Sequence, residues 1–341
     1  MPVLDAESLI QDRVRAIRRY HGASGIARAE LDVSGGIDSA TLLGLLVRAV
    51  GPERITAVYS SIHSAGFSLE RAREAAEAFR VPLVELDLSA VFDDLIAEAR
   101  RGLAAAGYSL EEIDARCAAD GTVLGSIRST LRAPVGRGLN RMTGGGLRHG
   151  TGNECEDRWL RFYQKGGDGE VDSNPIAMLA KGEVYQLARA LGVPRSIIDA
   201  MPTPDLQGVG EAHNDEDELK AASGGVEWTY SRIDFETGAY TKVGTIERLS
   251  RLLDLDEEGL LFGEIDPLSD PGRLDWLMGY AAITFPEYGE EARRNFLVSA
   301  RRWEAITRHK MNPNCPSLGR RATMLAAGIL TNSLPELPEG G

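Results

Sequence analysis

The sequence predicts an α/β protein, a three-layer sandwich with a central parallel sheet between layers of helices and a helical C-terminal extension. Through the first half of the chain, short strand-like segments alternate with amphipathic helical segments. Strands that alternate with helices pair in parallel, because each crossover helix returns the chain to the same edge of the sheet. A glycine-rich turn at residues 34–39 connects the first strand to its helix, which is typical of phosphate-binding folds of this class.

The elements of the first half are expected in a regular order. We expect helices at 5–21, 39–50, 68–79 and 91–107, and strands within 25–33, at 54–59 and at 81–86. Glu30 and Asp32 interrupt the apolar run of the first strand. Residues 121–152 are rich in Gly and Arg, and there we expect one helix that begins near Ser126, followed by a loop.

The second half reads as more helical. Residues 181–191 carry apolar side chains at helical spacing, and Gly192 follows as a stop. The acidic, glycine-containing stretch 207–225 predicts a mobile loop, and further helices are expected at 243–253, 274–284 and 290–306. We therefore expect a single domain over 1–334 with a helical insertion at about 234–301, and a disordered tail at 335–341.

Composition excludes several classes of function. The 341 residues carry a formal charge of −13, which argues against binding of nucleic acid polymers. No apolar run reaches the length of about 18 residues that a membrane span needs. Cys117, Cys155 and Cys315 are too widely spaced for a disulfide framework, and the N-terminus lacks the apolar core of a signal peptide. A cytoplasmic location is therefore expected.

The turn Ser34-Gly35-Gly36-Ile37-Asp38-Ser39 is the sharpest motif in the chain. Paired glycines let backbone N–H groups approach an oxyanion, and the helix that follows presents its positive end to it. Ser34 and Ser39 add hydroxyl donors, and Asp38 is placed to hold Mg²⁺ on a bound phosphate. The alternative is a capped turn without a ligand.

This motif resembles the signature of the N-type ATP pyrophosphatases, in which the loop grips the pyrophosphate released when a substrate is adenylylated. Further segments resemble the ammonia-dependent NAD synthetase family in order along the chain. They are GTGNECE at 150–156, FYQKGGDG at 162–169, Asp172 with NPI at 174–176, Lys181, PTPDL at 202–206, DEDEL at 215–219, and His309-Lys310. The resemblance implies an adenine nucleotide alpha hydrolase-like, Rossmann-like fold.

The resemblance also implies roles for individual residues. Asp38 and Glu156 would hold Mg²⁺. ATP would be bound by Ser34, Gly35, Gly36, Asp38, Ser39, Arg128, Arg132, Thr151, Lys181 and Thr203. The acid substrate would be bound by Lys165, Asp168, Asp172, His309 and Lys310. Asp172, Lys181 and Lys165 would be catalytic, with Asp172 orienting or deprotonating ammonium.

The chain departs from the family pattern on the acceptor side. An Asn of the family's N-x-[KQ]-A-R-x-R helix is Ser126 here, and its middle Arg is Thr130. The tyrosine of the family's KYGDG is Gly166, and the normally apolar strand before GTGN contains Arg148 and His149. The phosphate-binding residues are thus retained while the acid-binding side has changed.

Three functions remain open from the sequence. The first is a carbon–nitrogen ligase that adenylylates deamido-NAD with ATP, releases pyrophosphate and forms NAD with ammonia. The second is an amide ligase of the same fold that acts on another carboxylate, and the third is a non-catalytic nucleotide-binding homologue. The chain shows no glutaminase signature, so ammonia would be free or supplied by a separate protein. The family resemblance further implies a homodimer.

Overall fold

The computed structural model describes residues 5–161, 163–202, 214–222, 226–254, 271–307 and Lys310. The first half contains helices α1 (Ala6–Ser24), α2 (Ile37–Val50), α3 (Gly66–Phe79), α4 (Ser89–Ala105), α5 (Leu110–Ala119) and α6 (Thr122–Met142), with strands β1 (Ala29–Asp32), β2 (Ile55–Ser61), β3 (Leu83–Asp87) and β4 (Leu147–His149). The second half contains α7 (Lys181–Leu191), α8 (Arg195–Ile198), α9 (Asp215–Ala222), β5 (Arg232–Ile233), β6 (Tyr240–Lys242), α10 (Thr245–Asp254), α11 (Pro271–Thr284) and α12 (Glu290–Thr307).

The central sheet has the order β3-β2-β1-β4, and its neighbouring strands are parallel. This confirms the predicted α/β fold. In the register of the sheet, Glu30 lies between Thr56 of β2 and Arg148 of β4. The phosphate-loop segment follows the carboxyl end of β1, and the GTGN segment follows the carboxyl end of β4. Two neighbouring parallel strands therefore deliver both motifs to the same edge of the sheet.

The two faces of β1 differ in polarity. Ala29, Leu31 and Val33 belong to an apolar core that includes side chains of α1, α2 and α7. Glu30 and Asp32 alternate with them, so they face the other side of the sheet. That side is covered by α6, where a Cβ on Gly136 would lie 2.0 Å from Nη1 of Arg148. Helices thus cover both faces, as a three-layer sandwich requires.

Several details differ from the sequence-based expectations. The helix expected from Ser126 begins at Thr122 and continues through Pro134 to Met142. The loop expected after it contains β4, a strand hidden by its charged residues. Helix α5 was not expected, and part of the stretch expected to be a loop at 207–225 is helix α9. The tail at 335–341 lies outside the described residues.

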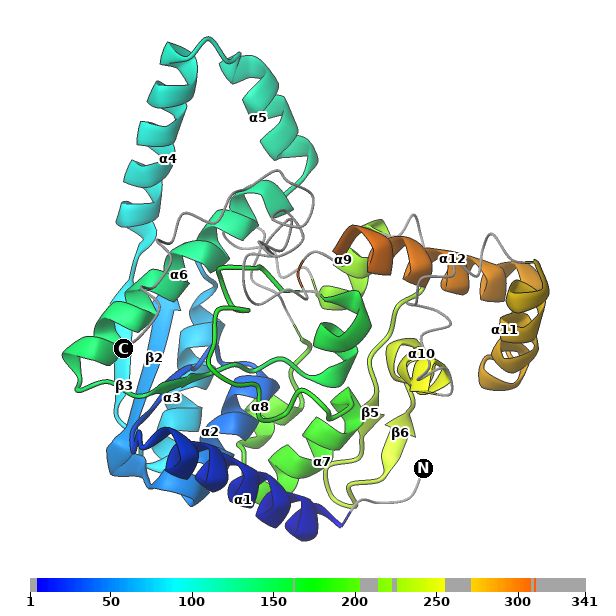
Figure 1. Cartoon of the computed structure of the whole chain (residues 1–341), viewed down its shortest axis with the longest axis horizontal. Coiled ribbons are helices and arrows are strands. Elements are labelled where there is room, and N and C mark those ends of the chain that lie inside the picture. The colour runs from blue at the N-terminus through cyan, green and yellow to red at the C-terminus, as the bar shows by residue number, and fades with distance from the viewer. Residues whose placement is uncertain are drawn as a thin grey trace, which may run out of the picture.

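The C-terminal part packs on the body of the protein. Helix α11 contacts both α10 and α12, and α10 and α12 contact the π-helical turn Cys155–Leu160. A second apolar core joins Cys155 and Ala180 to Trp228, Tyr230 and residues of these three helices. In Figure 1 these helices lie on the opposite side of the molecule from β2 and β3, and the α4–α5 hairpin projects from the body. Among the described helices, none is long and apolar enough to cross a membrane.

Candidate functional site

The phosphate loop is tightly folded between β1 and α2. Gly35 has φ +83°, and a Cβ there would lie 2.3 Å from the carbonyl oxygen of Ser68, so the loop requires glycine at this position. The Oγ of Ser39 is 3.2 Å from that of Ser34 and donates to the carbonyl oxygen of Gly36 at 2.9 Å. Ser34 is exposed, whereas Ser39 is buried and serves the loop's own backbone here.

Asp38, Glu156 and Lys181 meet beside this loop, although 143 residues separate the first from the last. Nζ of Lys181 lies 2.6 Å from Oδ2 of Asp38 and 2.8 Å from Oε1 of Glu156. Lys181 is only 1% exposed, because it begins α7 inside the molecule. The sequence motifs therefore identified three residues that the fold brings together.

Burial and the neighbouring charges have opposite effects on the pKa values of Lys181 and Glu156. Burial alone lowers the pKa of Lys181, but the carboxylates of Asp38 and Glu156 raise it well above its usual value. Burial raises the pKa of Glu156, against the effect of the Lys181 ammonium. Neighbouring Asp157 is also buried, which raises its pKa to about 8. The ammonium of Lys181 is thus firmly charged, and it is surrounded by carboxyl groups.

Asn153 is a member of the cluster that the sequence-based site omitted. Its Nδ2 donates to Oδ1 of Asp38 at 3.1 Å, and its Oδ1 accepts from the backbone N–H of Glu156 at 3.2 Å. Asn153 is fully buried, and its side chain links the carboxylate of Asp38 to the backbone of Glu156. Its place in GTGNECE was the signal that could have identified it.

The carboxylates of this cluster fit the expected Mg²⁺ in number and chemistry. Oxygens of Asp38 and Glu156 both lie within hydrogen-bond distance of one cationic atom, Nζ of Lys181, which shows that they can share a cation. Within the described residues, no group of three or more His, Cys, Asp or Glu side chains could hold a metal ion. Mg²⁺ needs no such cage, because it keeps waters and binds through one or two carboxylates together with phosphates.

Arg128 and Arg132 of α6 lie near the end of β2 and the start of α4. Nε of Arg132 donates to the carbonyl oxygen of Ser60 at 3.0 Å, and the guanidinium of Arg128 lies 5.5 Å from the centre of the Phe92 ring. The hydroxyls of Ser126 and Thr130, where the family has Asn and Arg, donate to the carbonyl oxygens of Val123 and Ser126 in their own helix. These contacts occupy both hydroxyls within α6.

The loop after the π-helical turn contains Lys165 and Asp168. Asp168 Oδ1 accepts from Ser129 Oγ at 2.9 Å and from the backbone N–H of Gln164 at 2.7 Å, which anchors the loop to α6. Lys165 is exposed. Nζ of Lys310 donates to the carbonyl oxygens of Arg161 and Tyr163, at 2.9 and 2.5 Å, so here it holds this loop.

The structure says less about the three remaining residues that the sequence assigned to the site. Thr151 is half-buried in the segment between β4 and Asn153. Thr203 and His309 lie outside the described residues.

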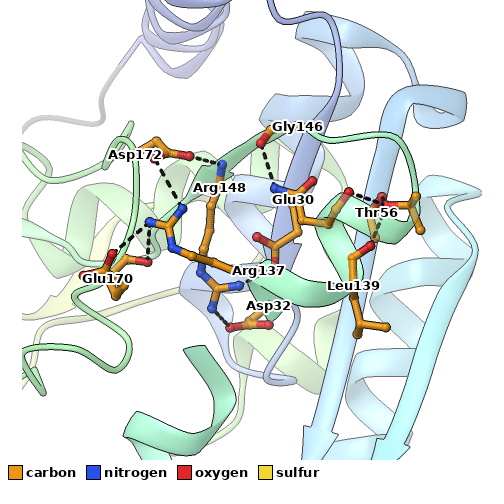
Figure 2. A network of polar contacts seen from close by, with 11 residues as sticks. Glu30, Asp32, Thr56, Arg137, Leu139, Gly146, Arg148, Glu170 and Asp172 are labelled. Carbon is orange, nitrogen blue, oxygen red and sulfur yellow. Dashed lines mark hydrogen bonds and ion pairs between the residues drawn. The ribbon is translucent and has the colours of Figure 1, made fainter. Parts of the chain in front are cut away.

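Asp172 belongs to a separate network of polar contacts, drawn in Figure 2. Its Oδ2 accepts the backbone N–H of Arg148 at 2.8 Å, and its Oδ1 lies 3.6 Å from Nη1 of Arg137. Arg137 also pairs with Glu170 at 3.1 Å. The carboxylate that the sequence nominates for ammonium is therefore tied to the end of β4 and faces a guanidinium of α6.

Arg148 explains the unusual residues in β1 and β4. Its Nη1 donates to Oε1 of Glu30 at 2.5 Å, and its Nη2 pairs with Asp32 (Figure 2). Arg148 and Glu30 are almost completely buried, and burial raises the pKa of Glu30 to about 7. The acidic interruptions in β1 and the basic residue in β4 are thus partners across neighbouring strands. The sequence shows each of these charged residues as a departure from an apolar strand, but it does not show that they pair with each other.

The fold and the site together define a class of α/β protein that places a phosphate loop, two carboxylates and a lysine at the carboxyl edge of a parallel sheet. A model of the NAD synthase family matches residues 9–234. An NH3-dependent NAD(+) synthetase of Methanococcoides burtonii is 31% identical over 236 residues, which are 69% of this chain and 78% of that relative. The chain belongs to the NAD synthase family.

The chain is also similar to other relatives and to solved structures. An NH3-dependent NAD(+) synthetase of Pseudomonas aeruginosa PAO1 is 31% identical over 237 residues, 67% of this chain and 80% of that relative. The NMN synthetase of Francisella tularensis has a TM-score of 0.62 at 18% identity, with 93% of this chain and 100% of that chain covered. The NAD+ synthetase of Burkholderia pseudomallei has a TM-score of 0.50 at 24% identity, with 75% and 90% covered. These structures share the fold.

Proposed function

We propose that this protein is a carbon–nitrogen ligase that uses ATP to amidate deamido-NAD with ammonia, forming NAD, AMP and pyrophosphate. The curated relatives carry the name NH3-dependent NAD(+) synthetase, and the chain covers more than three quarters of the first of them. The observation that carries the proposal is the convergence of Asp38, Glu156 and Lys181 beside the phosphate loop.

In the first half-reaction, the acid attacks the α-phosphorus of ATP and pyrophosphate leaves. Backbone N–H groups of the phosphate loop and the hydroxyl of Ser34 would bind the leaving pyrophosphate. The Lys181 ammonium would neutralise part of its charge. Asp38 and Glu156 would hold Mg²⁺, which supplies further positive charge to the phosphates when bound. The position and charge of the three side chains support these roles, because Lys181 is buried and its ammonium contacts both carboxylates.

In the second half-reaction, ammonia attacks the acyl carbon of the adenylate and AMP leaves. Asp172 is our candidate for orienting or deprotonating ammonium, and the backbone N–H of Arg148 holds its carboxylate in place.

Cys155 is an unsuitable nucleophile for a glutaminase, since it is fully buried and burial raises the pKa of its thiol far above the usual range. We therefore propose free ammonia as the nitrogen donor. The free thiols of Cys117 and Cys155 support the expected cytoplasmic location.

The reaction is tested with purified protein, ATP, Mg²⁺ and a panel of carboxylates that includes deamido-NAD. Ammonium and glutamine are supplied in separate arms, and AMP, ADP, pyrophosphate and amide are quantified. We expect AMP and pyrophosphate in equal amounts, with NAD formed from ammonium and little or none from glutamine. Stoichiometric ADP would refute the proposed chemistry.

Asp172→Asn should slow amide formation more than pyrophosphate release, and equal slowing of both would refute its assignment.

A second candidate is an amide ligase of the same mechanism with a different acid substrate. It is favoured by Ser126 and Thr130, whose hydroxyls bond to carbonyl oxygens of α6 where the family has an amide and a guanidinium. The same panel separates the two candidates. Pyrophosphate release that depends on another carboxylate, with deamido-NAD inactive, would favour the second candidate. ATP binding without release on any acid would favour a non-catalytic homologue.

A further inference from the structure

The start of α7 is buried and contacts a segment that lies beyond the family match at residues 9–234. The first N–H groups of a helix have no partner within it and need one elsewhere. The backbone N–H of Lys181 contacts Sγ of Cys155 at 3.5 Å, and that of Gly182 donates to Oε2 of Glu247 at 3.2 Å. Glu247 lies in the first turn of α10 and is 1% exposed.

Glu247 is held in turn by two neighbours. Its Oε2 accepts from Ser231 Oγ at 2.5 Å, and its Oε1 accepts from the hydroxyl of Tyr240 at 3.0 Å. A Cβ on Gly182 would lie 2.2 Å from the Tyr240 ring, so only glycine allows the ring to approach the helix this closely. Helix α10 and strand β6 thus contact the first turn of α7 through the carboxylate of Glu247 and the ring of Tyr240.

The side chain of Lys181 contacts Tyr230, which lies just before this segment. The ring centre of Tyr230 lies 5.1 Å from Nζ, and both residues are only 1% exposed. A carboxylate near a helix N-terminus is electrostatically favourable, so Glu247 stabilises the turn that carries Lys181. The backbone of Lys181 is therefore fixed from one side while its ammonium reaches Asp38 and Glu156 on the other.

We infer that Glu247 is a positioning residue for Lys181, through which the segment after residue 234 completes the phosphate side of the site. Glu247 acts through the backbone of α7 and does not touch the substrate. The inference rests on the proposed function only for the role of Lys181 in binding ATP.

The test is a double-mutant cycle on the binding of ATP with Mg²⁺, measured by calorimetry without the acid substrate. The proteins are wild type, Glu247→Gln, Lys181→Met and the double variant. We expect Glu247→Gln to weaken ATP binding about tenfold, since it removes the charge from a buried, charge-assisted hydrogen bond. The double variant should bind no more weakly than Lys181→Met, because the effect passes through Lys181.

Two further variants separate positioning from folding. Leu249→Ala empties part of the same core in α10 and should lower the melting temperature while leaving the ATP affinity of the folded protein within about twofold. Tyr240→Phe removes one hydrogen bond from Glu247 and should weaken ATP binding less than Glu247→Gln, which keeps the test usable if the latter fails to fold.

The inference would be overturned if Glu247→Gln bound ATP as tightly as wild type. It would also be overturned if Glu247→Gln weakened ATP binding by the same factor in the Lys181→Met variant as in wild type. A wild type that binds ATP but makes no amide would refute the proposed function alone. If the wild type makes amide but the effect of Glu247→Gln on ATP binding does not depend on Lys181, the positioning role alone is refuted. A wild type that fails to bind ATP would refute both.

Discussion

Asp38, Glu156 and Lys181 show how single residues shape the phosphate side of the site. Two carboxylates face one ammonium, so with both ionised the trio carries one net negative charge. Burial weakens the hydration of these groups and strengthens their mutual attraction. Since breaking a buried pair leaves the remaining charge uncompensated, each of the three supports the geometry of the others.

Replacement of either carboxylate should abolish the first half-reaction. We expect Asp38→Ala and Glu156→Ala each to slow pyrophosphate release by about a thousandfold or more, because each removes a ligand expected to hold the phosphate-bound metal. Circular dichroism should show that both variants stay folded. The matched control is Glu85→Ala, which removes an exposed carboxylate of β3 that pairs with Arg73 of α3, and it should retain full activity. Near-normal release by a folded Asp38 or Glu156 variant would refute the metal assignment.

His149 predicts a pH dependence of stability. Burial and, to a smaller extent, the neighbouring His21, whose Nε2 is 3.0 Å from that of His149, lower its pKa from 6.5 to about 4. A group whose pKa is depressed in the folded state stabilises the fold above its unfolded pKa, and this contribution is lost as the pH falls from about 6.5 to about 4. The difference corresponds to about 3 kcal/mol.

The measurement is urea unfolding between pH 7.5 and pH 4 for wild type and His149→Gln. The free energy of unfolding of the wild type should fall toward that of the variant as the pH decreases. A difference between the two proteins that is constant over this range would contradict the assignment.

The sequence predicted residues that share a motif and missed residues that share only space. Asp38 in SGGIDS, Glu156 in GTGNECE and Lys181 match the family pattern in order along the chain, so the resemblance implied a shared site. Glu247 is separated from Gly182 by 65 residues and belongs to no motif. Tertiary packing alone determines such contacts, and a single sequence does not record them.

Among the elements, the strands and helices with a clear apolar period were predicted best. Helix α7 has its predicted bounds, and β1, β2 and β3 lie within a few residues of the expected segments. The local pattern did not predict strand β4, because Arg148 and His149 remove its apolar character, and only the family resemblance placed a strand there. Their partners, Glu30 and His21, lie on other elements. Cross-strand compensation of this kind hides a strand from any reading of one segment at a time.

Helix α6 offers a matched pair of glycines for testing the close approach of this helix to the sheet. We expect Gly136→Ala to destabilise the fold by roughly 1–3 kcal/mol, because its Cβ would clash with Arg148, which two ion pairs hold in place. Gly138→Ala, with nothing within 4 Å of its Cβ, should instead stabilise the helix by up to about 1 kcal/mol. Chemical denaturation measures both, and equal effects would contradict the close packing of α6.

At the scale of the whole molecule, the α4–α5 hairpin projects from the body that the described residues form (Figure 1). Val91 and Leu95 lie one turn apart on α4 and are 52% and 43% exposed, and Tyr108 near the tip is 63% exposed. Exposed apolar side chains gathered on one element are typical of contact surfaces. Together with the family resemblance, this favours a homodimer.

We expect light scattering to show a dimer at working concentration. Val91→Lys combined with Leu95→Lys should shift the protein toward the monomer by placing like charges in the contact. Ile283→Lys on α11, at a side chain that is 78% exposed, is the control and should leave the assembly unchanged. A fully active monomeric wild type would count against the prediction.

The pairing of Arg148 with Glu30 and Asp32 also constrains how this sequence can change over generations. Losing Arg148 leaves the buried Glu30 without its ion pair, at a cost of about 3–5 kcal/mol, which is a large part of the stability of a typical domain. Losing either carboxylate removes one of the two ion pairs of the buried Arg148. Replacing all three by apolar residues would be close to neutral. The three positions are therefore epistatic, and descendants of this chain should keep the trio or exchange it as a unit.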